Sequence, residues 1–208
     1  MIFSYNKEHV GDVLMIILSD KKDTTVTVER KGNIARVFDP ETNQTLAWNI
    51  FEVSSLFSLV GNGQVFLSEE QIAILNQEFA KEGFTERFVY DAEPKFVVAQ
   101  IKEMIDHPDS DHLHICQVEI QNGKLVQIVC GAPNAAEGLK TVAALPGAMM
   151  PNGALIFPGE LRGESSYGML CSPRELELPN APQQRGIIEL DAAATVGEAF
   201  DPEKHWQG

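Results

Sequence analysis

Residues 124–134, Lys-Leu-Val-Gln-Ile-Val-Cys-Gly-Ala-Pro-Asn, contain a short run of β-forming residues that stops at a glycine and a proline. Such a run predicts a buried strand that is closed by a turn. Similar strand-like runs recur in this half of the chain, at residues 96–105, 113–120, 141–145 and about 186–190. Several short strands between Gly/Pro turns, with little helical periodicity, predict a small β-barrel.

The first ninety residues follow a different pattern. They contain four strand-like runs separated by turn sequences, which predict a small antiparallel meander, at residues 12–18, 24–30, 34–38 and 45–51. A helix is expected after them, because Ser68 and Gln71 have the spacing of a capping box and Gly83 is a suitable C-terminal stop. Strands followed by one helix predict a small α+β domain over residues 1–90.

A polar break divides the chain. Residues 91–94, Asp-Ala-Glu-Pro, have the composition of a linker. We therefore expect an α+β domain over 1–90, an all-β domain over 91–200 and a C-terminal tail over 201–208.

The charge balance restricts the function. The 208 residues include 16 Lys or Arg and 30 Asp or Glu, a formal net charge of −14. Residues 91–208 alone carry eight basic and seventeen acidic side chains. Such a chain repels phosphate on average, which disfavours a generic polyanion binder and an anionic membrane surface.

Other bulk features place the protein among cytoplasmic proteins. Three cysteines without a paired motif do not make a disulfide framework, and the first residues lack the basic region of a signal peptide. The sequence has neither a GxxxxGK[ST] loop nor a GxGxxG motif after a strand. We therefore expect no nucleotide cofactor, no metal and no enzymatic activity.

Four segments of the second half form an ordered set. They read His-Pro-Asp-Ser-Asp-His-Leu at 107–113, Gln-Ile-Val-Cys-Gly-Ala-Pro-Asn at 127–134, Ala-Leu-Pro-Gly-Ala at 144–148 continuing to Gly153, and Leu-Arg-Gly-Glu-Ser-Ser-Tyr-Gly-Met-Leu-Cys-Ser at 161–172, followed by Glu175-Leu176. In order and spacing they resemble the tRNA-binding OB-fold domain. That domain occurs in the bacterial phenylalanyl-tRNA synthetase β subunit, in some methionyl-tRNA synthetases and in free-standing tRNA-binding proteins.

The resemblance covers about residues 91–200, and the two-domain layout resembles the YtpR-type tRNA-binding-domain proteins of Gram-positive bacteria. It implies that a five-stranded OB barrel holds a structured part of tRNA, without catalysis, in a role in translation. One departure concerns His112, which stands where the family often has Lys or Arg.

The resemblance and the residue chemistry together suggest RNA contacts. Hydrogen-bonding and basic side chains of these segments are the candidates: Arg162, Ser165, Ser166, Ser172, Arg174, Asn134, Lys95 and Lys102. The guanidinium of Arg162 suits phosphate, whereas the Asn134 amide could read a base edge or a 2′-hydroxyl. For Asn134, a turn in which the amide bonds its own backbone is an equal alternative.

Three alternatives stay open. The second domain could instead be a protein-interaction module that binds itself or a translation component. A contiguous patch of Arg162, Arg174 and Lys140 would favour RNA binding over protein interaction, whereas a large apolar patch would favour protein interaction. Another is a hydrolase built on Cys171 or on a His/Asp cluster. The last is a metal site in that cluster, which consists of His107, Asp109, Asp111, His112 and His114 and whose sequence is also a turn signature.

Overall fold

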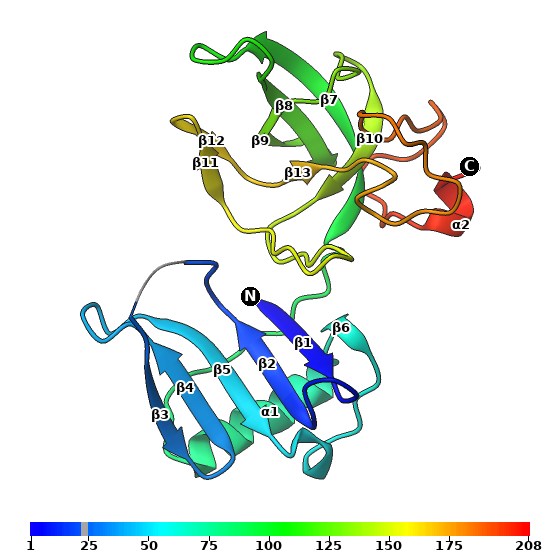
Figure 1. Ribbon diagram of the computed structural model, residues 1–208. Coiled ribbons are helices and arrows are strands. Elements are labelled where there is room, and N and C mark those ends of the chain that lie inside the picture. Colours follow the sequence, from blue (N-terminus) through cyan, green and yellow to red (C-terminus); the bar gives the residue numbers. More distant parts are fainter. Residues whose placement is uncertain (22–24) are drawn as a thin grey trace. The chain divides into compact units, whose positions relative to one another are not determined.

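The computed structural model describes residues 1–21 and 25–208, and two compact units divide the chain, residues 1–92 and 93–208 (Figure 1). Thr24, the first residue of one predicted strand, lies outside the described residues. In the described part of the chain, no helix has both the length and the apolar character that crossing a membrane requires.

The first unit consists largely of strands. They form one antiparallel sheet in the order β3-β4-β5-β2-β1-β6, with bounds β1 Ile2–Asn6, β2 Val13–Ile17, β3 Thr27–Lys31, β4 Ile34–Phe38, β5 Thr45–Phe51 and β6 Asn62–Val65. A short 3₁₀ turn, η1 (Val53–Ser55), and one helix, α1 (Glu69–Lys81), complete it. The sequence did not predict β1 and β6, because β1 interleaves Ser4 among apolar residues and β6 contains Gly63.

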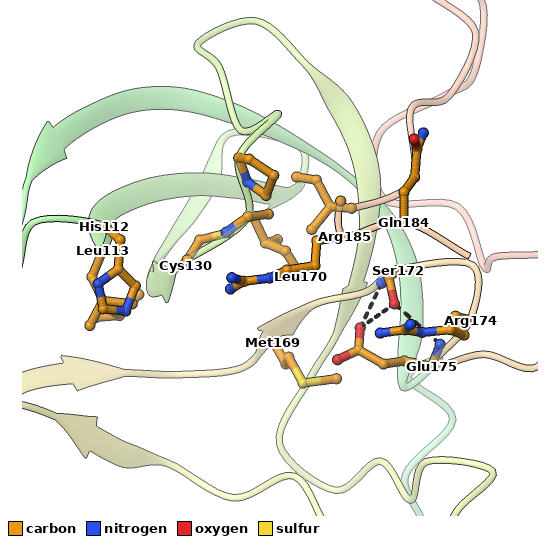
Figure 2. A pocket seen from close by; sticks show the side chains of 16 residues that line it. His112, Leu113, Cys130, Met169, Leu170, Ser172, Arg174, Glu175, Gln184 and Arg185 are labelled. Carbon is orange, nitrogen blue, oxygen red and sulfur yellow. Dashed lines mark hydrogen bonds between the residues drawn. The ribbon is translucent and has the colours of Figure 1, made fainter. Parts of the chain in front are cut away.

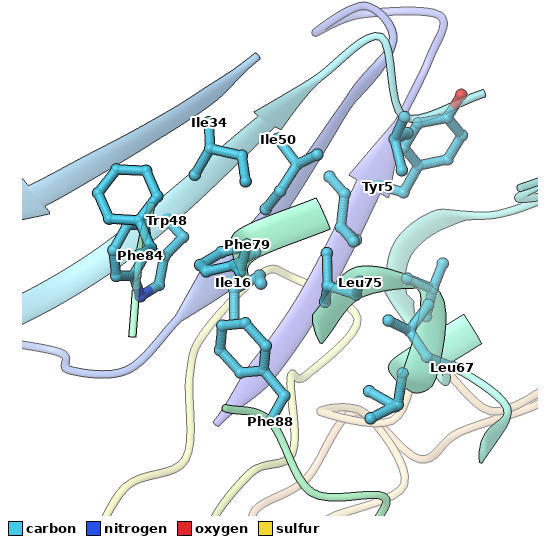
Figure 3. Packing of buried hydrophobic residues seen from close by; sticks show 14 residues of the cluster. Tyr5, Ile16, Ile34, Trp48, Ile50, Leu67, Leu75, Phe79, Phe84 and Phe88 are labelled. Carbon is cyan, nitrogen blue, oxygen red and sulfur yellow. The ribbon is translucent and has the colours of Figure 1, made fainter. Parts of the chain in front are cut away.

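The capping box predicted for the helix is confirmed. The Gln71 backbone N–H donates to Ser68 Oγ at 3.2 Å, and the Ser68 N–H donates to Gln71 Oε1 at 2.9 Å. The helix then buries one face against the sheet, as Figure 3 shows. Phe79 of this face meets Trp48 of β5 edge-on, with ring centroids 4.9 Å apart. Local capping and one aromatic contact therefore fix the position of α1 on the sheet.

The second unit contains a five-stranded antiparallel sheet that curls into a half-barrel (Figure 1). Its order is β13-β10-β7-β8-β9, with bounds β7 Phe96–Asp106, β8 His114–Gln121, β9 Lys124–Cys130, β10 Lys140–Ala144 and β13 Met169–Leu170. Register shifts in the β7–β8 and β8–β9 pairs bend the sheet. Its two edge strands, β13 and β9, contact each other, so the sheet nearly closes on itself.

A separate hairpin lies against β9. It is made of β11 (Gly159–Leu161) and β12 (Glu164–Ser166). The Tyr167 N–H donates to the Gln127 carbonyl at 2.8 Å, and the Val129 N–H donates to Ser166 Oγ at 3.1 Å. These bonds pair the Gln127 carbonyl and the Val129 N–H, at the outer edge of β9, with the segment that follows the hairpin and with the hairpin itself.

The prediction of a strand at about residues 186–190 is wrong. This segment is irregular and makes isolated backbone bonds, from Ile188 N–H to the Cys171 carbonyl and from Leu190 N–H to the Lys140 carbonyl, each 2.9 Å. The fifth strand of the sheet is β13, which lies inside the fourth of the ordered segments, residues 161–172. Leu170 of β13 is buried in the core of the second unit.

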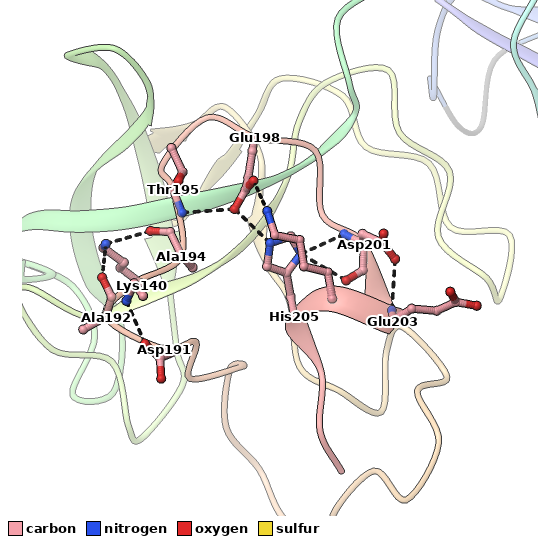
Figure 4. A network of polar contacts seen from close by, with 11 residues as sticks. Lys140, Asp191, Ala192, Ala194, Thr195, Glu198, Asp201, Glu203 and His205 are labelled. Atoms are coloured by element: carbon pink, nitrogen blue, oxygen red, sulfur yellow. Dashed lines mark hydrogen bonds and ion pairs between the residues drawn. The ribbon is translucent and has the colours of Figure 1, made fainter.

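The C-terminal segment is held by a polar network around Glu198 (Figure 4). The Glu198 carboxylate accepts from the Thr195 N–H at 3.0 Å, lies 2.9 Å from His205 Nε2 and pairs with Lys204. His205 and Lys204 belong to a short helix, α2 (Pro202–His205). The network thus ties α2 to the segment before it.

This network predicts an acid-sensitive C-terminal segment. The Lys204 ammonium, with His205 and the Thr195 N–H, lowers the pKa of Glu198 from 4.5 to about 2. Because the folded pKa is the lower one, the stabilisation is complete above pH 4.5 and is lost as the pH falls toward 2. We expect the fluorescence of Trp206, which donates to the Pro179 carbonyl at 2.7 Å, to change over this range.

Glu198→Gln should remove this acid transition, because the amide does not titrate. Glu203→Gln is the matched control, since Glu203 is exposed on the first turn of α2 and makes no side-chain bond among the described residues. An acid transition that is unchanged in Glu198→Gln would contradict the assignment.

Candidate nucleic-acid interface

A pocket of about 290 Å³ opens in the second unit where three of the four sequence segments meet (Figure 2). Its walls come from residues 112–113, from 129–133 at the end of β9, and from 169–175 in and after β13. The loop 184–187 closes the remaining side. Segments far apart in the sequence therefore build one concave surface.

The lining of the pocket mixes polar and apolar side chains. Its large apolar members are Leu113, Val129, Met169, Leu170 and Ile187. Val129, Leu170 and Ile187 are buried, so their side chains are fixed by core packing. A mixed lining of this kind offers both apolar packing and hydrogen-bonding groups to a ligand.

Two arginines stand at the rim, Arg174 and Arg185. Both are exposed, and neither guanidinium has an ion-pair or hydrogen-bond partner among the described residues. Arg174 is a predicted site residue, whereas Arg185 is not, because the run that follows it was interpreted as the last strand. The two guanidinium groups form a local cationic site on an acidic protein.

Ser172 and Glu175 lock each other beside the arginines. Glu175 Oε2 accepts from the Ser172 N–H at 2.8 Å and from the Ser172 hydroxyl at 2.7 Å. The Glu175 N–H in turn donates to Ser172 Oγ at 3.2 Å. Ser172, a predicted site residue, therefore lines the pocket, and its hydroxyl also fixes the loop that carries Arg174.

Asn134 holds the loop that carries Arg185. Its amide nitrogen donates to the Ile187 carbonyl at 3.0 Å and to Glu189 Oε1 at 2.9 Å, and its amide oxygen accepts from the Ile187 N–H at 2.9 Å. The sequence left two roles open for Asn134, a contact with an RNA base and a turn in which the amide bonds its own backbone. The bonds in the structure are of neither kind, because they join Asn134 to a distant segment of the chain. Asn134 is a positioning residue for the far side of the pocket.

Arg162 lies on the β11–β12 hairpin and does not line the pocket. Its Nη1 donates to the Asp109 carbonyl at 2.7 Å. Nearby, buried His107 accepts from the Asp109 N–H at Nδ1 and lies 3.1 Å from the Leu161 carbonyl at Nε2. Arg162 and His107 therefore fasten the hairpin to the 107–113 loop.

The two serines of β12 have different surroundings. Ser166 is buried, and its hydroxyl accepts from Val129 and donates to the Gly168 carbonyl at 3.2 Å, so it faces the sheet. Ser165 is half-buried, and its carbonyl accepts from the Gln127 amide. Neither serine lines the pocket.

The predicted lysines also lie away from the pocket. Lys102 Nζ lies 3.3 Å from Glu119 Oε2, and half-buried Lys95 directly precedes β7. Lys140, named with Arg162 and Arg174 as a possible patch, donates to the Ala192 and Ala194 carbonyls. The pocket joins Arg174 to Arg185 and not to Arg162 or Lys140.

Comparison with known proteins accounts for both units. Residues 96–199 match the family model "Putative tRNA binding domain", and residues 8–91 match a domain of unknown function, DUF4479. The chain is 43% identical to the "Putative tRNA-binding protein YtpR" of Bacillus subtilis over 196 residues, which cover 94% of this chain and 97% of that protein. The chain belongs to the YtpR-like tRNA-binding-domain family. The resemblance drawn from the four segments is confirmed.

The second unit is also similar to part of a larger protein. It is 50% identical over 101 residues to the phenylalanine–tRNA ligase β subunit of Bordetella parapertussis, and 52% over 107 residues to that of Rickettsia bellii. The match covers about half of this chain but 12% of each ligase subunit. Every residue that lines the pocket lies within the range of the tRNA-binding-domain match.

The chemistry of this family member differs from that of a cysteine hydrolase. Burial raises the pKa of Cys171 to about 12, and the nearby Glu175 carboxylate acts in the same direction. A nucleophilic cysteine needs a lowered pKa, so Cys171 has the opposite property. Among the described residues, no three His, Cys, Asp or Glu side chains are grouped as a metal site would require.

Proposed function

We propose that this protein binds tRNA without catalysing a reaction, and that its second unit is an OB-fold barrel which holds a structured part of the RNA. The relative that matches nearly the whole chain is named as a tRNA-binding protein, and the second unit matches the tRNA-binding-domain model. A curled five-stranded antiparallel sheet is the architecture expected of an OB fold. A place in the cytoplasm fits this function.

The observation that carries the proposal is the pair of unpartnered arginines at the pocket rim. A cation that already forms an ion pair gives up that pair when it binds phosphate, whereas Arg174 and Arg185 have no partner to lose among the described residues. Arginine also binds phosphate through two parallel bonds. The site therefore offers localised phosphate contacts within a chain of net charge −14.

Binding of bulk tRNA and of duplex DNA of similar length, measured by filter retention at low salt, tests the proposal. We expect the protein to retain tRNA in preference to the duplex, because the contacts are localised and fit one shape. We also expect a shallow salt dependence, since few phosphates are neutralised. Equal retention of the two nucleic acids, or of neither, would contradict the proposal.

Exposed apolar side chains support the alternative of a protein-docking module that binds itself or a translation component. Leu161 and Tyr167, on either side of β12, are 43% and 46% exposed, and Ile105 near the end of β7 is 64% exposed. Such residues can anchor a protein partner. A module of this kind gives no preference for tRNA in the retention assay.

A further inference from the structure

We propose that the pocket takes one unstacked nucleobase, with guanine preferred, and that Glu175 reads its amino edge. The inference rests on the proposed function, because it names the part of the RNA that enters the site. It assigns to Glu175 a role in base specificity. It assigns to Arg174 and Arg185 the contacts with the phosphates that flank the base.

The carboxylate of Glu175 is a prepared hydrogen-bond acceptor. Its Oε2 is held by the Ser172 N–H and hydroxyl at 2.8 and 2.7 Å, whereas its Oε1 has no partner among the described residues. Glu175 itself lines the pocket. Its carboxylate therefore borders the pocket with one oxygen free to accept.

A carboxylate is out of place in a site for phosphate alone. It repels the phosphate that Arg174 and Arg185 attract, which weakens binding for no gain. The same carboxylate is useful if a base enters, because it accepts from amino and ring N–H groups and rejects edges that carry only acceptors. The combination of two arginines and one fixed carboxylate thus fits a nucleotide better than a bare phosphate.

The apolar side chains of the lining support the same conclusion. Leu113 and Met169 are half-buried and line the pocket, so they offer apolar surface to the face of a base. The volume of about 290 Å³ accommodates a single nucleobase. Proteins that read single-stranded RNA positions hold splayed bases on aromatic rings and on arginine planes, and the pocket lining offers His112, Arg174 and Arg185 for this purpose.

Guanine satisfies the carboxylate best. Its N1–H and 2-amino group are adjacent donors, whereas adenine and cytosine each offer one amino group beside an acceptor, and uracil offers one N–H between two carbonyl oxygens. We therefore expect guanine to be preferred over uracil, and the 2-amino group to contribute to the preference.

Titration with mononucleotides, followed by the NMR methyl signals of Leu113, Met169 and Ile187, tests the inference on the full chain. Guanosine and inosine monophosphates form the critical pair, because they differ only in the 2-amino group. We expect inosine monophosphate to bind about tenfold more weakly, the size of one hydrogen bond to a charged acceptor. Equal shifts with both nucleotides and with ribose 5-phosphate would overturn the inference.

Glu175→Gln distinguishes two roles of the carboxylate, because it should change nucleotide binding differently if the carboxylate recognises guanine and if it only repels phosphate. The amide oxygen can keep the bonds from Ser172, while the amide nitrogen places a donor where Oε1 was an acceptor. If the carboxylate reads guanine, the variant loses the preference for guanosine over inosine monophosphate. If the carboxylate only repels phosphate, the variant binds both nucleotides and ribose 5-phosphate more tightly, and the inference fails.

Glu177→Gln is the matched control. It removes the same charge two residues away, on an exposed side chain that does not line the pocket, and should leave the nucleotide preference unchanged. Retention of tRNA is measured separately on the same samples. Retained tRNA without nucleotide discrimination overturns this inference alone, whereas discrimination without tRNA retention overturns the proposed function.

Discussion

Replacing Arg174 and Arg185 together by alanine should weaken tRNA binding about 30-fold at low salt, or about 2 kcal/mol, because each guanidinium supplies about 1 kcal/mol of exposed phosphate contact. The two side chains stand on separate loops of one pocket, so both lose contacts in the double variant. Filter retention at several salt concentrations measures the effect. Loss of two phosphate contacts should also reduce the slope of log affinity against log salt by about 1.5.

Lys124→Ala is the charge-matched control for each single arginine variant. Lys124 begins β9, and Val129, the first pocket residue of that strand, follows five residues later, about 16 Å along the strand at about 3.3 Å per residue. We expect a change in affinity below about twofold. A loss in Lys124→Ala equal to that in Arg174→Ala would show that net charge, and not the pocket, governs binding.

Gly168→Ala should destabilise the second unit by about 3 kcal/mol, since it combines backbone strain with a steric clash. The Gly168 φ is +147°, and an added Cβ would lie 2.7 Å from the Ala144 carbonyl oxygen. Ala144 is the β10 partner of Met169, so relief of the clash separates β13 from β10. Urea unfolding, followed by methyl NMR signals of the second unit, measures the loss.

Two other glycines separate strain from clash. Gly163 has φ +86° with open space around its Cβ position, so Gly163→Ala should cost about 1 kcal/mol from backbone strain. Gly159 has neither feature, and Gly159→Ala should change stability by less than about 0.5 kcal/mol. If the Gly168 variant were as stable as the Gly159 variant, the close approach of β13 to β10 would be refuted.

Local signals predicted part of the fold. Ser68 and Gln71 lie three residues apart, and the capping box that they form depends on nothing else in the chain. The runs that became β7 to β10 are long enough for composition to reveal them. By contrast, β13 has two residues, and its pairing with β10 joins positions far apart in the sequence.

The site was predictable only in pieces. The resemblance pointed to Ser172 and Arg174, which line the pocket, and to Arg162, which does not. Arg185 was missed because the run after it was read as a strand, whereas its loop is held by Asn134, 53 residues from Ile187. Contacts between such distant segments leave no periodic pattern in the sequence. The remaining sequence signal for Arg185 was its place in a short stretch between a turn-forming proline and glycine, Pro182 to Gly186.

Photo-crosslinking of bulk tRNA to the intact protein, with the attached peptides identified by mass spectrometry, tests the central claim most directly. We predict crosslinks on peptides that contain residues 169–175 and 184–187, and their loss in the Arg174→Ala/Arg185→Ala variant. Crosslinks confined to residues 1–92, or a yield no greater than with duplex DNA, would contradict the claim that this pocket binds tRNA.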